Sequence, residues 1–427
     1  MHIGSDETYE LGQCSECSKK SNEIGIKGLY HHFSNKAANF ITSHNRKPMI
    51  WESPMGWTKD SAAGNFSPNK NLVLTEEMTD GNIELVKQAK RMGFKSFFYD
   101  PNPGIEPVFL PYMYTENDDR VKLAGCLENS FTTLRAAAAS GVYDGVIRTS
   151  WDDAGLHNQQ WMLAFVTAAA FSWNSKEQGI EEFKITFFKN YYGPAITDMN
   201  ELFTLLNAGA YFYWDSFERK NWHYGEIGKT HLPDLPRGDA IEYDPFWNTE
   251  YSNMIRRAEK ESGQMEKAIG IITANKQSAT KNKYDFDLFE TIAELIKHTA
   301  GTYITLSTVE KNIQQAHRFT FIRKDSAELK LKEAENLLSA NIEERKKVMD
   351  KLIQVWQETR LEKGMSSLNK KYFFQQDRTR HFANRLPGMQ YLIYDEEKLD
   401  IDGYRKRLHD YIEDYKIGTF QRSKIKL

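Results

Sequence analysis

Short apolar segments alternate with amphipathic segments over the first 173 residues. The apolar segments are rich in β-branched and aromatic residues, as is typical of strands buried on both faces, and they predict strands over 1–5, 48–53, 71–75, 95–100 and 145–151. Between them, apolar residues three and four positions apart predict helices over 29–45, 81–93 and 127–141. Strands that alternate with helices in this way predict an α/β fold with a parallel sheet and right-handed crossovers.

After Trp173 the strand pattern nearly disappears and amphipathic helices dominate. The apolar spacing predicts helices over 179–194, 197–212, 247–275, 284–315, 326–362 and 401–415, and a Gly/Pro-rich loop over 223–245. Asn341 with Glu344 resembles a capping box, which predicts that the 326–362 stretch is two helices. The chain is therefore expected to have two domains, 1–173 and 174–427.

The bulk composition excludes some classes of partner. The 427 residues carry a net charge of −3, which gives no electrostatic footprint for nucleic acid. The longest apolar run, 162–173, is too short to span a bilayer. The first residues do not form a signal peptide, so the compartment stays open: periplasmic or extracellular if an export signal lies upstream, otherwise cytoplasmic. The oligomeric state is also open.

Three cysteines are present, and two of them, Cys14 and Cys17, form a C-x-x-C pair, with Cys126 apart. Zinc would need four ligands, and no second pair lies at zinc spacing. The pair is therefore interpreted as structural or incidental, with a redox or metal role as the alternative. We expect no metal and no cofactor.

Polar and aromatic residues follow the predicted strands at their carboxyl ends, where parallel βα folds place their functional groups. The pairs are Asp6–Glu7, Trp51–Glu52, Tyr99–Asp100 and Trp151 with Asp152–Asp153. Carboxylates at the centre of a pocket and indoles at its walls suit a carbohydrate ring, whose flat apolar faces stack on aromatic side chains.

The stretch "HIGSDE" at residues 2–7 resembles the H-x-G-G-D-E signature of glycoside hydrolase family 20, the β-N-acetylhexosaminidases, and "HIGSDETYELG" is similar to the hexosaminidase D-like branch. Three later strands, "MIWES", "FFYD" and "GVIRTSWDD", resemble the family's fifth, seventh and eighth barrel strands in order. The resemblance covers about residues 1–173. It implies a partial (β/α)8 TIM barrel, strands four to eight, followed by an α-helical C-terminal region, with strands one to three absent from this chain.

The resemblance also implies a function: removal of terminal β-linked N-acetylhexosamine by substrate-assisted retaining catalysis, in which the substrate's own acetamido oxygen attacks the anomeric carbon. Glu7 is then the general acid and base, and Asp6 accepts the acetamido N–H. Tyr99 holds the acetamido carbonyl. The substrate-binding residues are Trp51 and Trp151 at the walls, with Asp153 and Asp100 at the sugar hydroxyls.

Two features depart from the family pattern. Ser5 replaces the second glycine of the signature, which we interpret as tolerated because serine is small. Asp100 directly follows Tyr99, whereas the family spaces its Tyr and Asp one residue further apart, so this assignment is the weaker one.

Two other functions remain open at this stage. One is a truncated, inactive glycosidase-like chain that acts as a binding module or scaffold, because five of eight strands leave two open sheet edges. The other is a barrel glycosidase with a carboxylate nucleophile, Glu52 or Asp153, about 5–5.5 Å from Glu7.

Overall fold

The structure is a computed structural model, and it describes residues 1–5, 8, 10–51, 68–76, 80–100, 127–149, 157–174, 179–213, 216, 247–320, 322–362 and 400–417. The chain divides into two compact units. The first comprises residues 1–103, 119–150 and 162–183, and the second comprises 104–118, 151–161 and 184–427. The two-domain division at Trp173 expected from the sequence stays a prediction.

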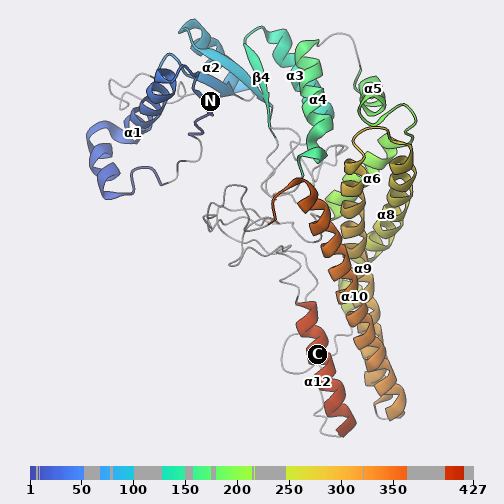
Figure 1. Ribbon diagram of the computed structural model, residues 1–427. Coiled ribbons are helices and arrows are strands. Elements are labelled where there is room, and N and C mark those ends of the chain that lie inside the picture. Colours follow the sequence, from blue (N-terminus) through green and yellow to red (C-terminus); the bar gives the residue numbers. More distant parts are fainter. Residues whose placement is uncertain are drawn as a thin grey trace. The chain divides into compact units, whose positions relative to one another are not determined.

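The first unit contains a parallel sheet whose strands follow one another in chain order, β1-β2-β3-β4 (Figure 1). The strands are β1 (Met49–Trp51), β2 (Val73–Glu76), β3 (Lys95–Asp100) and β4 (Gly145–Arg148). The segment at the N-terminus adds a single parallel bridge, His2 to Met49, outside β1. The structure thus confirms four of the predicted strands, and reduces the fifth, over 1–5, to a bridge.

Four helices belong mainly to this unit: α1 (Ser15–Ser43), α2 (Asp80–Arg91), α3 (Leu127–Ser140) and α4 (Met162–Trp173). Helix α1 begins well before the predicted start at Leu29, and Gly25 interrupts it with φ 74°. Glycine adopts this left-handed conformation without the steric cost that a Cβ brings, so the kink falls at this residue.

The second unit is helical in the part that the structure describes. Helix α5 (Ile180–Tyr192) begins in the first unit and ends in the second. The others are α6 (Met199–Tyr213), α7 (Trp247–Glu250), α8 (Ser252–Ser278), α9 (Tyr284–Phe319), α10 (Lys324–Thr359) and α12 (Ile401–Ile417). The long helices α8, α9 and α10 run side by side, and α12 packs on α10 (Figure 1).

An apolar core runs along α9, α10 and α12. Its buried members are spaced three, four and seven residues apart on each helix, as expected for helices that share one seam. They include Leu306, Val309 and Ile313 on α9, Leu331, Ala334 and Leu338 on α10, and Tyr404, Leu408 and Ile412 on α12. The amphipathic pattern therefore predicted these helices for the correct physical reason.

The helix break predicted at Asn341 is wrong, because α10 continues from Lys324 to Thr359. Asn341 is buried, and its side-chain amide donates to Thr302 Oγ1 on α9 at 3.2 Å instead of capping a helix. Glu344 lies 3.8 Å from the ring nitrogen of His298, also on α9. Both polar side chains serve the packing of α10 against α9, so their spacing imitates a capping box.

Within the described residues, no helix combines the length and the apolar character that crossing a membrane would require.

Candidate functional site

The two faces of the sheet have different surroundings. Residues that are partners in register share a face, and neighbours along a strand alternate between faces. One face carries Ile50, Leu74, Phe98 and Val146, and these residues belong to the hydrophobic clusters that include side chains from α1 to α4. Among the described residues, the strand members of those clusters all lie on this helix-covered face.

The opposite face gathers three aromatic rings near the carboxyl ends of the strands. His2 and Trp51 lie with their ring centroids 4.0 Å apart, and Trp51 lies 4.8 Å from Tyr99. The three residues come from the N-terminal segment, β1 and β3, separated by 48 to 97 positions in the chain. The structure therefore brings together Trp51 and Tyr99, two of the residues that the sequence singled out.

The ring of His2 is held in a defined orientation. The backbone N–H of Gly4 donates to His2 Nδ1 at 3.1 Å, so this nitrogen carries the lone pair and Nε2 carries the proton. Nε2 faces Thr75 Oγ1 at 3.5 Å, and Thr75 itself donates to the carbonyl of Ile50 at 2.5 Å. Gly4 and Thr75 thus fix the imidazole ring of His2, against which Trp51 packs.

On the same face, Gly145 of β4 is the register partner of Phe97 of β3. Gly145 has no side chain, and the ring of Phe97 occupies the space, since a Cβ at Gly145 would lie 3.0–3.1 Å from three of its ring carbons. Such contacts are closer than ordinary van der Waals packing, so the glycine makes room for the aromatic side chain.

The N-terminal segment turns sharply just before the predicted catalytic pair. Ile3 N–H donates to Met49 O at 2.8 Å, and Trp51 N–H donates to Gly4 O at 3.0 Å, which keeps the segment beside β1. Gly4 and Ser5 then have φ values of 70° and 78°. A non-glycine residue in this region is strained, so Ser5 is accommodated with a cost in the backbone and not simply by its small size.

Several predicted site residues lie outside the described residues. These are Asp6, Glu7, Trp151 and Asp153, and also Glu52 of the alternative mechanism. Asp100 ends β3 at the register position of Arg148, and nothing is described of its side chain. Of the seven predicted residues, the structure therefore brings Trp51 and Tyr99 together, and the roles of all seven stay predictions.

The helix-covered face also carries polar groups, but they are involved in packing. Arg148 Nη1 donates to Ser130 Oγ on α3. Tyr143 precedes β4 and packs against the cluster around Phe98. Burial, with the charge of Glu76 as a second cause, raises the pKa of Tyr143 to about 12. Arg148 thus joins β4 to α3, and neither Arg148 nor Tyr143 belongs to the aromatic row.

The described residues contain no group of three or more His, Cys, Asp or Glu side chains that could hold a metal ion. The face away from the hydrophobic clusters carries the rings of Trp51 and Tyr99 and the imidazole of His2, and Tyr99 is 7% exposed. Such a set can stack on a sugar ring and donate a hydrogen bond to it.

No protein-family model matches the chain, and no curated protein matches it. Among solved structures, one match is a GH138 enzyme targeting pectin rhamnogalacturonan II, with 14% identity and a TM-score of 0.36, covering 89% of this chain and 58% of that one. Another is a β-N-acetylhexosaminidase from Bacteroides fragilis, with 16% identity and a TM-score of 0.32, covering 44% of this chain and 38% of that one.

Both of these solved structures are of glycoside hydrolases. The chain spans less than two thirds of the length of either solved structure.

Proposed function

We propose that this chain provides five consecutive βα units of a (β/α)8 barrel, equivalent to strands four to eight of glycoside hydrolase family 20, and that it removes terminal β-linked N-acetylhexosamine. Three observations support the barrel. The strands are parallel, they follow one another in chain order, and the clusters with the helices involve one face of the sheet. A doubly wound sheet would reverse its strand order and carry helices on both faces.

The observation that carries the proposal is the row His2–Trp51–Tyr99 on the face away from those clusters. In a barrel this face is the interior, and its carboxyl end is the active site. The row also lies beside the segment that leads into Asp6 and Glu7, because Gly4 accepts a hydrogen bond from Trp51.

In the proposed reaction Glu7 protonates the leaving oxygen and later activates water, while Asp6 orients the acetamido group. Tyr99 donates a hydrogen bond to the acetamido carbonyl, and Trp51 and Trp151 enclose its methyl group. Asp153 binds sugar hydroxyls, and Asp100 is the weaker candidate for the same role. The substrate's acetamido oxygen takes the place of a protein nucleophile, as in the substrate-assisted glycosidases.

The direct test is release of nitrophenol from aryl β-glycosides of N-acetylglucosamine and N-acetylgalactosamine. We expect Glu7→Gln to lower the rate by about 10²–10⁴-fold, the usual contribution of a general acid. Glu10→Gln is the matched control, since Glu10 is exposed three residues further on and should leave the rate unchanged.

The assay should be run on this chain and on a form extended upstream by any further βα units that the gene encodes. Activity that Glu7→Gln does not reduce would contradict the proposal, and so would inactivity of both forms.

A second candidate is a sugar-binding protein without catalysis. It is favoured by the open edges of the sheet, since within the described residues neither the N-terminal segment nor β4 has a further strand beside it. An incomplete barrel could still stack a sugar on Trp51. Tryptophan fluorescence titrated with N-acetylglucosamine, with Trp51→Phe as the variant, separates this case: saturable binding without hydrolysis identifies the binding protein.

A further inference from the structure

Helix α1 begins with two free cysteines that the proposed glycosidase site does not use. Cys14 is the N-cap residue, and its Sγ accepts the backbone N–H of Cys17 at 3.2 Å. Cys14 is exposed and Cys17 is partly exposed, and neither is in a disulfide. The sulfur of Cys14 therefore occupies the place that a serine or aspartate oxygen normally takes at a helix start.

This position favours the thiolate form of one of the two cysteines. Backbone N–H groups at a helix N-terminus stabilise a negative charge, and a thiol with a lowered pKa is the reactive one. The hydrogen bonds from the side chain and backbone of Cys17 lower the pKa of Cys14. The same side-chain bond raises the pKa of Cys17. The pair is thus unequal, with the more exposed sulfur as the better thiolate.

The surroundings of the pair match those of a reactive dithiol. It lies between the N-terminal segment, which a single parallel bridge joins to β1, and the body of α1, an arrangement similar to a βαβ unit in which the first strand is only a bridge. A C-x-x-C pair in such a unit is a known setting for thiol–disulfide chemistry. Because the described residues contain no third ligand for a metal ion near it, the geometry favours a redox role over zinc.

We propose that Cys14 and Cys17 form a thiol–disulfide exchange site for small disulfides, with Cys14 as the attacking and Cys17 as the resolving cysteine. The Cys14 thiolate attacks one sulfur of a disulfide RSSR, a Cys14–S–S–R bond forms, and one RS⁻ leaves. Cys17 then loses its proton and attacks the Cys14 sulfur, which closes the Cys14–Cys17 disulfide and releases the second RS⁻. The net reaction oxidises the protein dithiol and reduces RSSR to two thiols.

Closing this disulfide should leave the fold intact. The two residues are three positions apart, and their side chains are already hydrogen-bonded within the first turn of α1. The new covalent ring is confined to that turn, so the rest of α1, including the kink at Gly25, carries no added constraint.

The test uses the full chain with Cys126→Ser, so that only the pair can react. After incubation with oxidised glutathione and acid quenching, intact mass should show the loss of two hydrogen atoms. In Cys17→Ser, one glutathione should become trapped on Cys14. In Cys14→Ser, Cys17 should react about tenfold more slowly than Cys14 does in Cys17→Ser, since the attacking thiolate is gone.

Cys14→Ser is also the structural control, because a serine oxygen can accept the same N–H and keep the helix cap. If Cys14→Ser loses thiol–disulfide exchange while its circular dichroism spectrum is unchanged, Cys14 has a redox role and is not needed only as a helix cap. Equal rates for the two single variants would overturn the proposal. So would a rate for the intact pair that is the same in the native chain and in urea.

Discussion

The helical unit and the sheet unit use their buried polar side chains in different ways. In the helical unit they join helices: Tyr404 of α12 donates to Glu310 of α9 at 3.1 Å, and Tyr192 of α5 donates to Asp285 of α9 at 3.2 Å. In the sheet unit, polar and aromatic groups gather at the carboxyl ends of the strands, on the face away from the hydrophobic clusters.

This difference separates two reasons for a polar group inside a protein. A polar pair between two helices compensates for its own burial and sets the register of the helices. A row of rings at the carboxyl ends of parallel strands, on the face away from the hydrophobic clusters, lies where such folds bind their ligands. The predictions below test this distinction.

Of the effects that test this comparison, the largest is expected for Tyr99→Phe. If the phenol holds the acetamido group, its loss should lower kcat for the aryl glycoside by about 10²-fold, since a small error in positioning costs that much. The matched control is Tyr143→Phe, from the helix-covered face of the same sheet. It should leave kcat unchanged, and equal losses in both variants would show that the two faces do not differ in function.

The second prediction concerns Glu261, a buried glutamate in the helical unit. Glu261 of α8 is 6% exposed, and within the described part of the chain its Oε1 has no hydrogen bond. Burial raises its pKa to about 7, although Lys260 and Arg257 act in the opposite direction. The folded chain thus holds this proton over a pH range in which the unfolded chain has lost it.

The direction in which stability changes with pH follows from proton linkage. Because the folded pKa is raised, the free energy of unfolding should fall as the pH rises from about 4.5 to 7, by about 3 kcal/mol, and stay level above. Glu261→Gln should remove this dependence and raise stability at pH 8. Urea unfolding at several pH values measures both, and Glu259→Gln on the same helix, at an exposed position, is the control.

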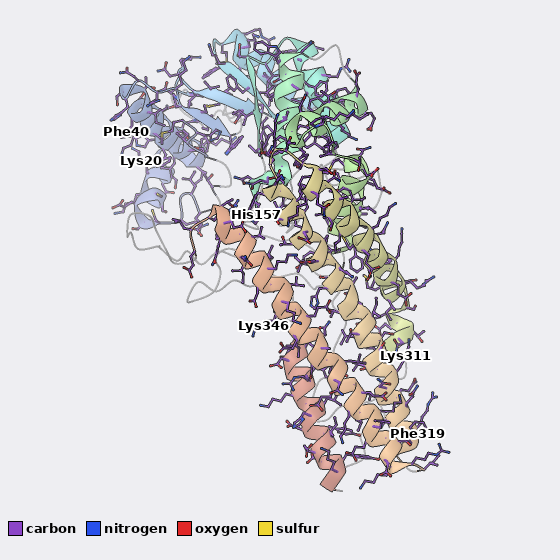
Figure 2. All side chains as sticks on the ribbon, turned by 45° about the vertical axis from the view of Figure 1, so that its right-hand side comes forward. Lys20, Phe40, His157, Lys311, Phe319 and Lys346 are labelled. Carbon is purple, nitrogen blue, oxygen red and sulfur yellow. The ribbon has the colours of Figure 1, made fainter. Side chains whose placement is uncertain are left out.

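Figure 2 shows another buried titratable group of the second unit, His157, beside the helices α9 and α10. Its ring lies 5.9 Å from that of Tyr284, and burial, with the charge of Arg360 as a second cause, lowers its pKa to about 3. The imidazole is therefore neutral at ordinary pH. His157 lies four residues after Asp153, a predicted site residue, but its buried ring packs against Tyr284. The sequence alone does not distinguish such a packing residue from a site residue.

A smaller effect is expected for Tyr404→Phe. Glu310 loses one hydrogen-bond donor, which should destabilise the chain by about 1–2 kcal/mol. Leu408→Met, one turn away in the same core, is the control for packing and should cost less. Since this pair is structural, the proposed glycosidase activity should not change in the variant below its unfolding temperature. A loss of activity in the folded variant would contradict that assignment.

The sequence predicted much of the fold because the signals that decide it are local. The five apolar segments and the three-four spacing after Trp173 follow directly from burial. Contacts between residues that are distant in the chain could not be predicted from these local patterns. Asn341 bonds to Thr302 across two helices, so its polar spacing was misread as a cap. For the site, family resemblance singled out Trp51 and Tyr99, whereas the hydrogen bonds of His2 depend on Gly4 and Thr75 and left no pattern in the sequence.

The smallest effect is expected for Ser5→Gly, the change that restores the glycine of the family signature. Serine at φ 78° costs about 1–2 kcal/mol of backbone strain, and the buried Oγ of Ser5 has no hydrogen-bond partner among the described residues. Glycine removes both penalties but loses about 0.4–1 kcal/mol through its freer unfolded chain. The net gain should be about 1 kcal/mol in urea unfolding with an unchanged m-value.

Ser5→Ala distinguishes the two sources of that gain, because it removes the hydroxyl and keeps the Cβ. If backbone strain is the larger cost, alanine should recover less than half of the stability that glycine recovers. If Ser5→Gly instead destabilises the chain, the turn before Asp6 and Glu7 is not strained, and the departure from the family signature is neutral after all. The same pair of variants also reports on the site: a relaxed turn that leaves the rate of aryl glycoside cleavage unchanged would show that the strain does not position Glu7.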